Sequence, residues 1–227
     1  MIKAVIFDLD GTILDSIDTF WRAFNAGVAT FKLEPVAKEH LLRLMNQGAS
    51  LDEILIDIYP ELRAESVSLT VEGIMIEIRK EYVAQSGDKV GLTSGARELL
   101  NLLRLRGLRI GIVTSRNIAP EKQWRELAKL QVAHFIDAVV TAVGAKRKPA
   151  PDTVIACLKK LELLPKECIF VGDSQADMRA GKAAGVGTVA IASGVGGREE
   201  LEAESPDFLF DNLPSFIEKL DSILSGY

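Results

Sequence analysis

The stretch Ala4-Val5-Ile6-Phe7-Asp8-Leu9-Asp10-Gly11-Thr12 decides the fold of this 227-residue chain. A short apolar run rich in Val and Ile is typical of a buried parallel strand, and this one ends abruptly at two carboxylates. Side chains alternate along a strand, so Asp8 and Asp10 are expected on the same side. Two like charges about 4 Å apart cost roughly 4 kcal/mol at an effective dielectric constant near 20. We therefore expect the pair to bind a cation, share a proton or take part in a reaction; the alternative is an ordinary polar turn.

The composition is that of an ordinary soluble protein with enough apolar residues for a full core. With 48% hydrophobic residues, the chain suits one large domain or one domain with an insertion. A net charge of −5 predicts neither nucleic acid nor an acidic membrane as a partner. The N-terminal apolar segment is too short for a secretory signal, and no stretch approaches a membrane span, so we expect a cytoplasmic protein. Cys157 and Cys168 are expected to be small buried side chains.

An apolar run followed by polar residues recurs in the second half of the chain. The further strands are expected at residues 110–113, 135–140, 168–171 and 188–192. Helical patterns between and after them cover residues 95–105, 121–130, 152–161, 175–184 and 214–224. Strands that alternate with helices predict an α/β fold, a Rossmann-like parallel sheet with helices on both faces. Ligands of such sheets bind at the carboxyl ends of the strands, where the candidate residues fall.

The segment between the first and second strands is too long for a simple connection. A strand-helix-strand crossover needs about a dozen residues or somewhat more, whereas Thr12 to Arg109 contains no convincing strand. Apolar residues recur at helical spacing from Ile17 to Phe31 and from Val67 to Tyr82. The sequence therefore predicts an inserted all-helical cap domain, residues 16–86, and a core domain of residues 1–15 and 87–227.

A polar loop joins two of the expected cap helices. It contains Asn46, Gln47 and Gly48, followed by Ala49 and Ser50. We expect the first three to contact a substrate, although turn chemistry alone explains the loop equally well.

A second acidic segment, Gly172-Asp173-Ser174-Gln175-Ala176-Asp177, follows the fourth expected strand. If a helix begins near Asp173, Asp177 faces the same side. Helix capping accounts for Asp173 alone and leaves Asp177 unexplained. Together with the first acidic pair, these carboxylates are hard oxygen ligands suited to magnesium. Lys148 supplies the opposite charge, and two prolines close to it hold its loop out of a helix.

Four segments of the chain resemble the ordered motifs of the haloacid dehalogenase-like superfamily. They are Asp8 to Thr12, Thr114 after the second core strand, Lys148-Pro149, and Gly172-Asp173 with Asp177. The helical insertion directly after the first motif is similar to that of the subgroup containing phosphoglycolate phosphatase and beta-phosphoglucomutase. Ser115 and Arg116 depart from the pattern, because many relatives have Asn and Lys there, so that loop does not indicate the substrate.

The resemblance implies a phosphatase that works through a covalent intermediate. Asp8 would attack phosphorus to form an aspartyl-phosphate. Asp10 would protonate the leaving oxygen and then activate water. Thr114, the backbone amide of Ser115 and the charge of Lys148 would hold the phosphoryl oxygens.

The resemblance also implies a magnesium cofactor. Mg²⁺ would lie between Asp8, the backbone carbonyl of Asp10 and Asp173. Asp177 would orient metal-bound water or Lys148 from outside this set. The cap would close over the substrate and exclude bulk water.

The resulting prediction is a magnesium-dependent phosphatase of a small phosphorylated metabolite, with phosphoglycolate as the first choice, acting as a monomer or homodimer. A phosphomutase would use the same core, but its cap must hold a second phosphate. The cap loop offers no Arg or Lys for that purpose, although Arg43 lies nearby in the sequence. A dehalogenase would not need Asp10. A phospho-accepting regulatory module is the non-enzymatic alternative, and the long cap and Asp10 favour turnover over signalling.

Overall fold

A six-stranded parallel sheet forms the body of the computed structural model, which describes residues 1–63, 68–87 and 89–226. The strands, in the spatial order β5-β4-β1-β6-β7-β8, are β5 Ala138–Val140, β4 Arg109–Val113, β1 Ala4–Asp8, β6 Cys168–Gly172, β7 Gly187–Ile191 and β8 Phe208–Phe210. Every neighbouring pair in this order is parallel. The predicted Rossmann-like parallel sheet is confirmed.

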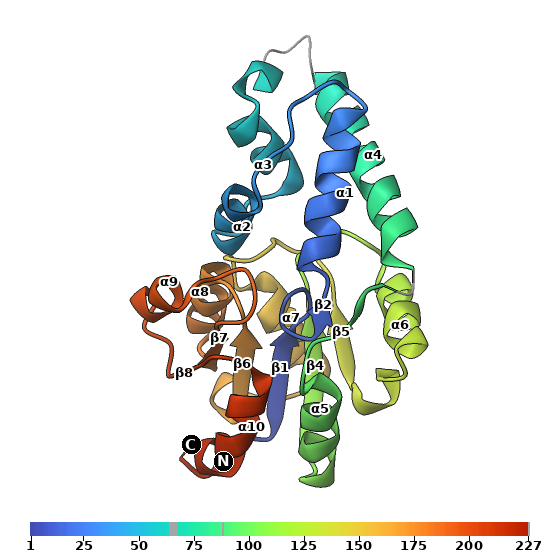
Figure 1. The fold of residues 1–227 in the computed structure, drawn as a ribbon. Helices are drawn as coiled ribbons and strands as arrows, with labels where there is room; N and C mark the ends of the chain where they lie inside the picture. Colours follow the sequence, from blue (N-terminus) through green and yellow to red (C-terminus); the bar gives the residue numbers. More distant parts are fainter. Residues whose placement is uncertain (64–67, 88, 227) are drawn as a thin grey trace.

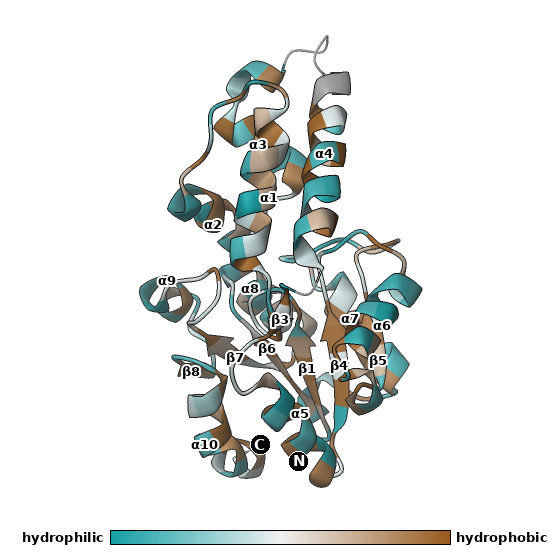
Figure 2. Cartoon of the chain, turned by 45° about the vertical axis from the view of Figure 1, so that its right-hand side comes forward, coloured by the Kyte–Doolittle hydropathy of each residue, from teal (hydrophilic) through white to brown (hydrophobic). Residues whose placement is uncertain are grey.

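Helices cover both faces of the sheet (Figure 1). On one face lie α5 Ala96–Leu105, α6 Pro120–Lys129 and α10 Leu213–Ser225, and on the other α7 Asp152–Leu161 and α8 Gln175–Ala184. Val5 and Phe7 of β1 pack in the first hydrophobic cluster, whereas Ala4 and Ile6 pack in the second. Because β1 is buried on both faces, its sequence is a continuous apolar run and shows no alternation of apolar and polar residues. The central strands are accordingly coloured mostly brown, the colour of hydrophobic residues, in Figure 2.

A second group of helices lies above the carboxyl edge of the sheet (Figure 1). These elements are α1 Ile17–Ala29, α2 Lys38–Asn46, α3 Leu51–Ile58, the 3-10 turn η1 Pro60–Arg63 and α4 Ser68–Ser86. They share a hydrophobic cluster of their own, which includes Phe24, Leu41, Leu55 and Ile74. The division into a cap of residues 16–86 and a core of residues 1–15 and 87–227 remains a prediction.

The two longest helices of this group pack closely against each other. Gly27 of α1 faces Ile78 of α4, and a Cβ atom at Gly27 would lie 2.7 Å from the backbone nitrogen of Ile78. Only glycine allows this approach, which fixes α4 against α1. The strands β2 Leu14–Asp15 and β3 Gly91–Leu92 form a short antiparallel pair. They lie in the two segments by which the chain leaves the sheet for the helical group and returns from it.

Several elements differ from the sequence-based expectations. The strand expected at residues 135–140 begins only at Ala138, because Ala133–Phe135 forms a 3-10 turn, η3. β8, the β2–β3 pair and the short helix α9 Arg198–Ala203 were not predicted, since two or three residues are too few for a periodic pattern and α9 has only six. Cys157 and Cys168 are buried free thiols, as expected. In the described part of the chain, each helix is too short or too polar to cross a lipid bilayer.

Candidate active site

The centre of the sheet brings the acidic segments together. β1 lies between β4 and β6 and ends at Asp8. Asp8 is in register with Val113, which immediately precedes Thr114, and Asp173 follows the last residue of β6. From β1 the chain continues to β4 and β5 on one side and then crosses to β6 on the other. Ligands of open α/β sheets bind at such a switch in direction. Here it faces the helical group formed by α1 to α4 (Figure 1).

Lys148 links two carboxylates inside this site. Its ammonium group donates to Oδ1 of Asp8 and, at 2.5 Å, to Oδ1 of Asp177. Only 4% of Lys148 is exposed, and both carboxylates are buried. Burial alone would lower the pKa of Lys148, but Asp177 and Asp8 raise it above its ordinary value. Lys148 therefore stays charged, and its head group is fixed as expected from its loop.

Asp173 is held by donors on both of its oxygens. Thr12 Oγ1 donates to Oδ1 at 2.8 Å, and the backbone N–H of Val195 donates to Oδ2 at 2.7 Å. Burial raises the pKa of Asp173 to about 7, with a further contribution from Asp177, although these two hydrogen bonds lower it. Gly194 leaves the space that Asp173 occupies, because a Cβ atom there would overlap the carboxylate.

The three buried carboxylates fit a divalent metal ion. Ligand oxygens of Asp8, Asp173 and Asp177 all lie within 4.8 Å of one another. Lys148 is the one cation that the described residues pair with this cluster, so negative charge is in excess. Burial, Asp177 and Asp173 raise the pKa of Asp8 well above its ordinary value, against the effect of Lys148. A compact, oxygen-only donor set with unbalanced negative charge is suited to Mg²⁺.

Asp177 also caps the helix that follows β6. Its Oδ2 accepts from the backbone N–H of Ser174 at 3.1 Å and from the Ser174 hydroxyl at 2.5 Å. The Ser174 hydroxyl in turn accepts from the backbone N–H of Asp177, which completes a capping box at the start of α8. Asp177 thus uses one oxygen for the helix and the other for Lys148.

Asp10 faces a different set of partners from Asp8. The Arg116 guanidinium donates from Nε to Oδ2 at 2.7 Å and from Nη2 to Oδ1 at 2.5 Å, and the Ser16 hydroxyl donates to Oδ1 at 2.6 Å. Burial alone would raise the pKa of Asp10, but the charge and hydrogen bonds of Arg116 lower it below the ordinary value. The two carboxylates of the first motif therefore have opposite pKa shifts.

Thr114 and Ser115 lie directly after β4, at the edge where Asp8 ends β1. Thr114 is buried, and its hydroxyl accepts from the backbone N–H of Arg116 at 3.2 Å. Ser115 is half-buried. Their predicted contacts with phosphoryl oxygens remain predictions.

The cap loop contacts the core of the protein. Asn46 is fully buried; its Oδ1 accepts from the backbone N–H of Gln175 at 2.7 Å, and its Nδ2 donates to Glu200 at 2.9 Å. Gly48 has φ +85°, and a Cβ atom there would lie 2.8 Å from the carbonyl oxygen of Lys148. Gln47 is exposed. The structure therefore brings this loop to the Lys148 segment, while substrate contact by these three residues stays a prediction.

Four residues of the site were not assigned a role from the sequence. Thr12 was given only as the last residue of the first motif or of a polar turn, and Val195 was not singled out. Ser174 and Arg116 were likewise noted without a partner. A useful signal was available for Val195, because its loop follows β7 at the same carboxyl edge of the sheet.

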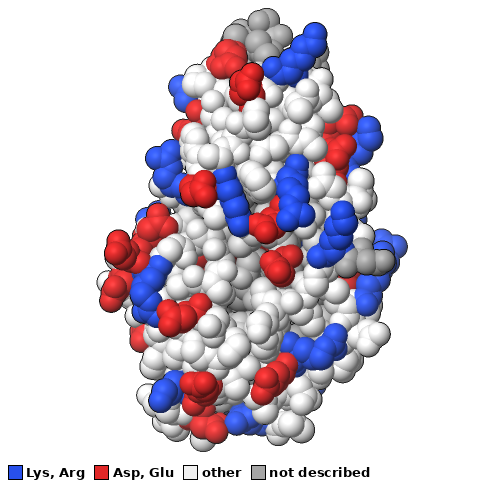
Figure 3. Space-filling view, viewed as in Figure 1, with Lys and Arg blue, Asp and Glu red and all other residues white. Residues whose placement is uncertain are grey.

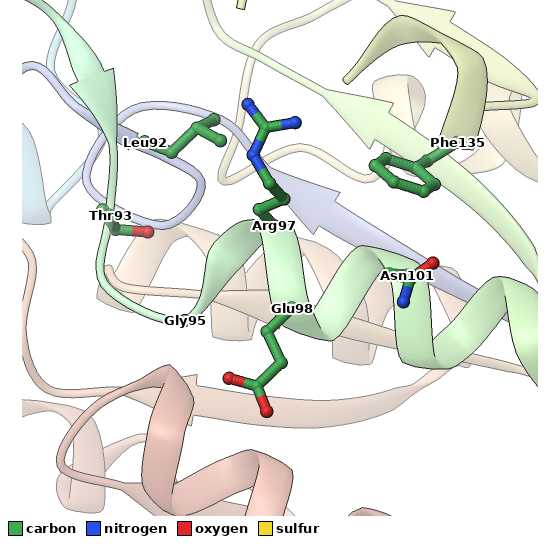
Figure 4. A pocket seen from close by; sticks show the side chains of 7 residues that line it. All are labelled: Leu92, Thr93, Gly95, Arg97, Glu98, Asn101 and Phe135. Atoms are coloured by element: carbon green, nitrogen blue, oxygen red, sulfur yellow. The ribbon is translucent and has the colours of Figure 1, made fainter. Parts of the chain in front are cut away.

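An open hollow lies on the surface outside this site. A hollow of about 600 Å³ is lined by Leu92, Thr93, Gly95, Arg97, Glu98, Asn101 and Phe135 (Figure 4). All seven belong to β3, α5, the turn between them or η3, so the hollow is separate from the four motif segments. On the face shown in Figure 3, positive and negative side chains are interspersed.

Comparison with known proteins gave matches along the whole chain. A family model described as haloacid dehalogenase-like hydrolase matches residues 5–191. A candidate pyrophosphatase, PpaX, of Clostridium perfringens is 32% identical over 98% of this chain and 100% of its own length. A phosphoglycolate phosphatase of Vibrio parahaemolyticus is 28% identical over 96% of this chain and 95% of its own. The solved structure of a haloacid dehalogenase-like hydrolase from Streptococcus pneumoniae has the same fold, with a TM-score of 0.82 at 21% identity, over 96% of this chain and 98% of that one.

Proposed function

Because the chain belongs to the haloacid dehalogenase-like hydrolase family, we propose that it is a magnesium-dependent phosphatase of a small phosphorylated metabolite, acting through an aspartyl-phosphate. The observation that carries this proposal is the buried cluster of Asp8, Asp173 and Asp177 around Lys148, at the sheet edge below the cap helices. A nucleophile, an anchored cation and a donor set for a metal ion meet there.

Asp8 is the nucleophile. Lys148 holds its Oδ1, and Oδ2 accepts no hydrogen bond from the described residues. An oxygen of Asp8 attacks phosphorus, the bond from phosphorus to the leaving oxygen breaks, and Asp10 donates a proton to that oxygen. A water molecule then attacks the phosphorus while Asp10 takes up a proton, which releases phosphate and restores Asp8.

The surrounding residues stabilise the transferred phosphoryl group. Lys148, the Thr114 hydroxyl and the backbone N–H of Ser115 supply positive charge and donors for its oxygens. Asp8, Asp173 and the carbonyl of Asp10 would hold Mg²⁺, with Asp177 orienting Lys148. When bound, Mg²⁺ offsets the negative charge of both the carboxylates and the phosphoryl oxygens.

Phosphoglycolate is the first candidate substrate, and the similarity to the Vibrio parahaemolyticus phosphatase supports it. The similarity to the Clostridium perfringens protein favours inorganic pyrophosphate as a second candidate. Both are small, and both carry a second anionic group beside the phosphoryl group that is transferred.

The test is phosphate release from a panel of small phosphate esters and pyrophosphate, with magnesium and with chelator. We expect turnover that requires magnesium and is lost in Asp8→Asn, because the amide is a poor nucleophile. Asp221→Asn, at an exposed residue of α10, is the matched control and should keep full activity. Full activity of Asp8→Asn, or no phosphate release by the native protein from any panel member, would overturn the proposal.

A further inference from the structure

We propose that Arg116 is a positioning residue that holds the Asp10 carboxylate for proton transfer and couples it to cap helix α4 through Tyr82. The inference rests on the proposed function, in which Asp10 exchanges the proton. Arg116 was noted from the sequence only as a departure from the second motif, and Tyr82 lies outside the four motif segments.

Three donors fix the orientation of the Asp10 carboxylate. Arg116 binds both oxygens, from Nε at 2.7 Å and from Nη2 at 2.5 Å, and the Ser16 hydroxyl adds a third bond at 2.6 Å. A two-pronged contact of this kind sets the plane of a carboxylate as well as its position, which a single hydrogen bond does not. Proton transfer depends on this placement, because the carboxyl group must lie within hydrogen-bond reach of the leaving oxygen.

Arg116 is itself held from both parts of the molecule. On the core side, its backbone N–H donates to the Thr114 hydroxyl, and its Nη1 donates to Glu126 of α6 at 2.9 Å. On the cap side, Nη2 donates to the Tyr82 hydroxyl at 2.8 Å, and the guanidinium carbon lies 5.4 Å from the centre of the Tyr82 ring. The Arg116 side chain is only 17% exposed. These contacts use three guanidinium nitrogens, a pattern that the ammonium group of a lysine does not reproduce.

Tyr82 brings the cap into this arrangement. It lies on α4 four residues before the helix ends at Ser86, close to the return of the chain to the core. Its ring packs edge-on against Phe20 of α1, with ring centres 6.2 Å apart. Burial raises the pKa of Tyr82 to about 12, so its hydroxyl keeps its proton. Any displacement of α4 relative to the sheet therefore moves a group that contacts Arg116, and through it the placement of Asp10.

The test compares two substrates whose leaving groups differ. The alkyl oxygen of phosphoglycolate needs a proton to leave, whereas p-nitrophenolate leaves from p-nitrophenyl phosphate without one. We expect Arg116→Ala to lower kcat for phosphoglycolate about 10²-fold at a similar KM, as when a catalytic group is misplaced by about 1 Å. With p-nitrophenyl phosphate, the same variant should give a rapid burst of one p-nitrophenolate per protein and then slow turnover, because only the second step still requires Asp10.

Further variants separate positioning from folding. Arg116→Lys should restore the charge without restoring kcat, and Tyr82→Phe, which removes one hydroxyl, should lower kcat about threefold to tenfold, the equivalent of one hydrogen bond. Arg125→Ala is the matched control, since Arg125 is an exposed arginine of α6 next to Glu126 and should behave as native. If Arg116→Ala does not fold, Tyr82→Phe and Arg116→Lys carry the test.

Three outcomes would overturn the inference. A raised KM at unchanged kcat would make Arg116 a substrate anchor. If Arg116→Ala loses both the burst and the turnover, Arg116 has a structural role. Native kinetics in both Arg116→Ala and Tyr82→Phe would exclude any role of these residues. Each of these requires an active native protein, whereas a native protein that releases phosphate from no member of the full panel overturns the proposed function itself.

Discussion

Without a metal ion in the acidic cluster, the stability of this protein should fall as the pH rises from 5 to 8. The pKa of Asp173 is about 7 in the folded protein, against an ordinary value of 3.8. Between these values the folded state holds a proton that the unfolded state has lost, so stability decreases with rising pH and levels off above pH 7. At about 1.4 kcal/mol for each pKa unit, the full loss is about 4 kcal/mol, of which about 3 kcal/mol falls between pH 5 and pH 8. The raised pKa of Asp8 acts in the same direction.

Urea unfolding in the presence of chelator, at pH 5 and at pH 8, measures this loss. Asp173→Asn removes the titrating group and should reduce the difference in unfolding free energy by about 3 kcal/mol. Asp221→Asn, at an exposed position, should leave the difference unchanged. Saturating magnesium at pH 8 should restore stability, by about 2.7 kcal/mol at a hundred times its dissociation constant. A native protein whose unfolding free energy stays level or rises with pH relative to Asp173→Asn would refute the reasoning.

Three substitutions test the other contacts around the site. Lys148→Met leaves Asp8 and Asp177 buried without their cation, so urea unfolding should show that the free energy of unfolding falls by about 3–5 kcal/mol. A fall below about 1 kcal/mol would contradict the buried ion pair. Gly48→Ala puts a Cβ atom against the Lys148 carbonyl at a position with positive φ. We expect the free energy of unfolding to fall by about 1–3 kcal/mol and the KM to rise. No change in either quantity would contradict the close approach of the cap loop to Lys148. Asn46→Ala leaves the backbone N–H of Gln175 without its partner and should cost about 1–3 kcal/mol in thermal unfolding; a raised KM at native stability would instead favour the predicted substrate contact.

The central strands of the sheet and the composition of its carboxyl edge were predictable from the sequence. β1, β4 and β6 are buried strands of five residues, long enough for an apolar run, and each is followed by the polar residues that identify the motifs. The recognition of the family, the α/β fold and the assignment as a hydrolase are therefore confirmed. β8 and the β2–β3 pair were missed because strands of two or three residues carry no periodic signal.

The pairing of side chains across the site was not predictable in the same way. Asp10 and Arg116 are 106 positions apart, and Asn46 lies 129 positions from Gln175. The first pair depends on how the loops after β1 and β4 turn at the sheet edge, and the second on how the end of α2 packs against α8, neither of which hydrophobic periodicity describes. The polar loop at Asn46 suggested a substrate contact because a polar residue in a turn is usually solvated. In the structure its polar atoms are occupied by partners on the core.

The opposite environments of Asp8 and Asp10 explain how two carboxylates in one motif can do different work. Burial and neighbouring acids raise the pKa of Asp8 against the effect of Lys148, so the ionised form is less favoured there than in an exposed carboxylate. In the proposed mechanism, a cation beside Asp8 would lower that pKa and favour the ionised nucleophile, which would link metal binding to the first step of the reaction. Arg116 has the contrary effect on Asp10, since it lowers the pKa of Asp10 and so favours the ionised form, which the proposed second step uses to accept a proton from water. The proposed first step uses the protonated form, which Arg116 disfavours, so in that mechanism Asp10 would have to gain a proton as the substrate binds.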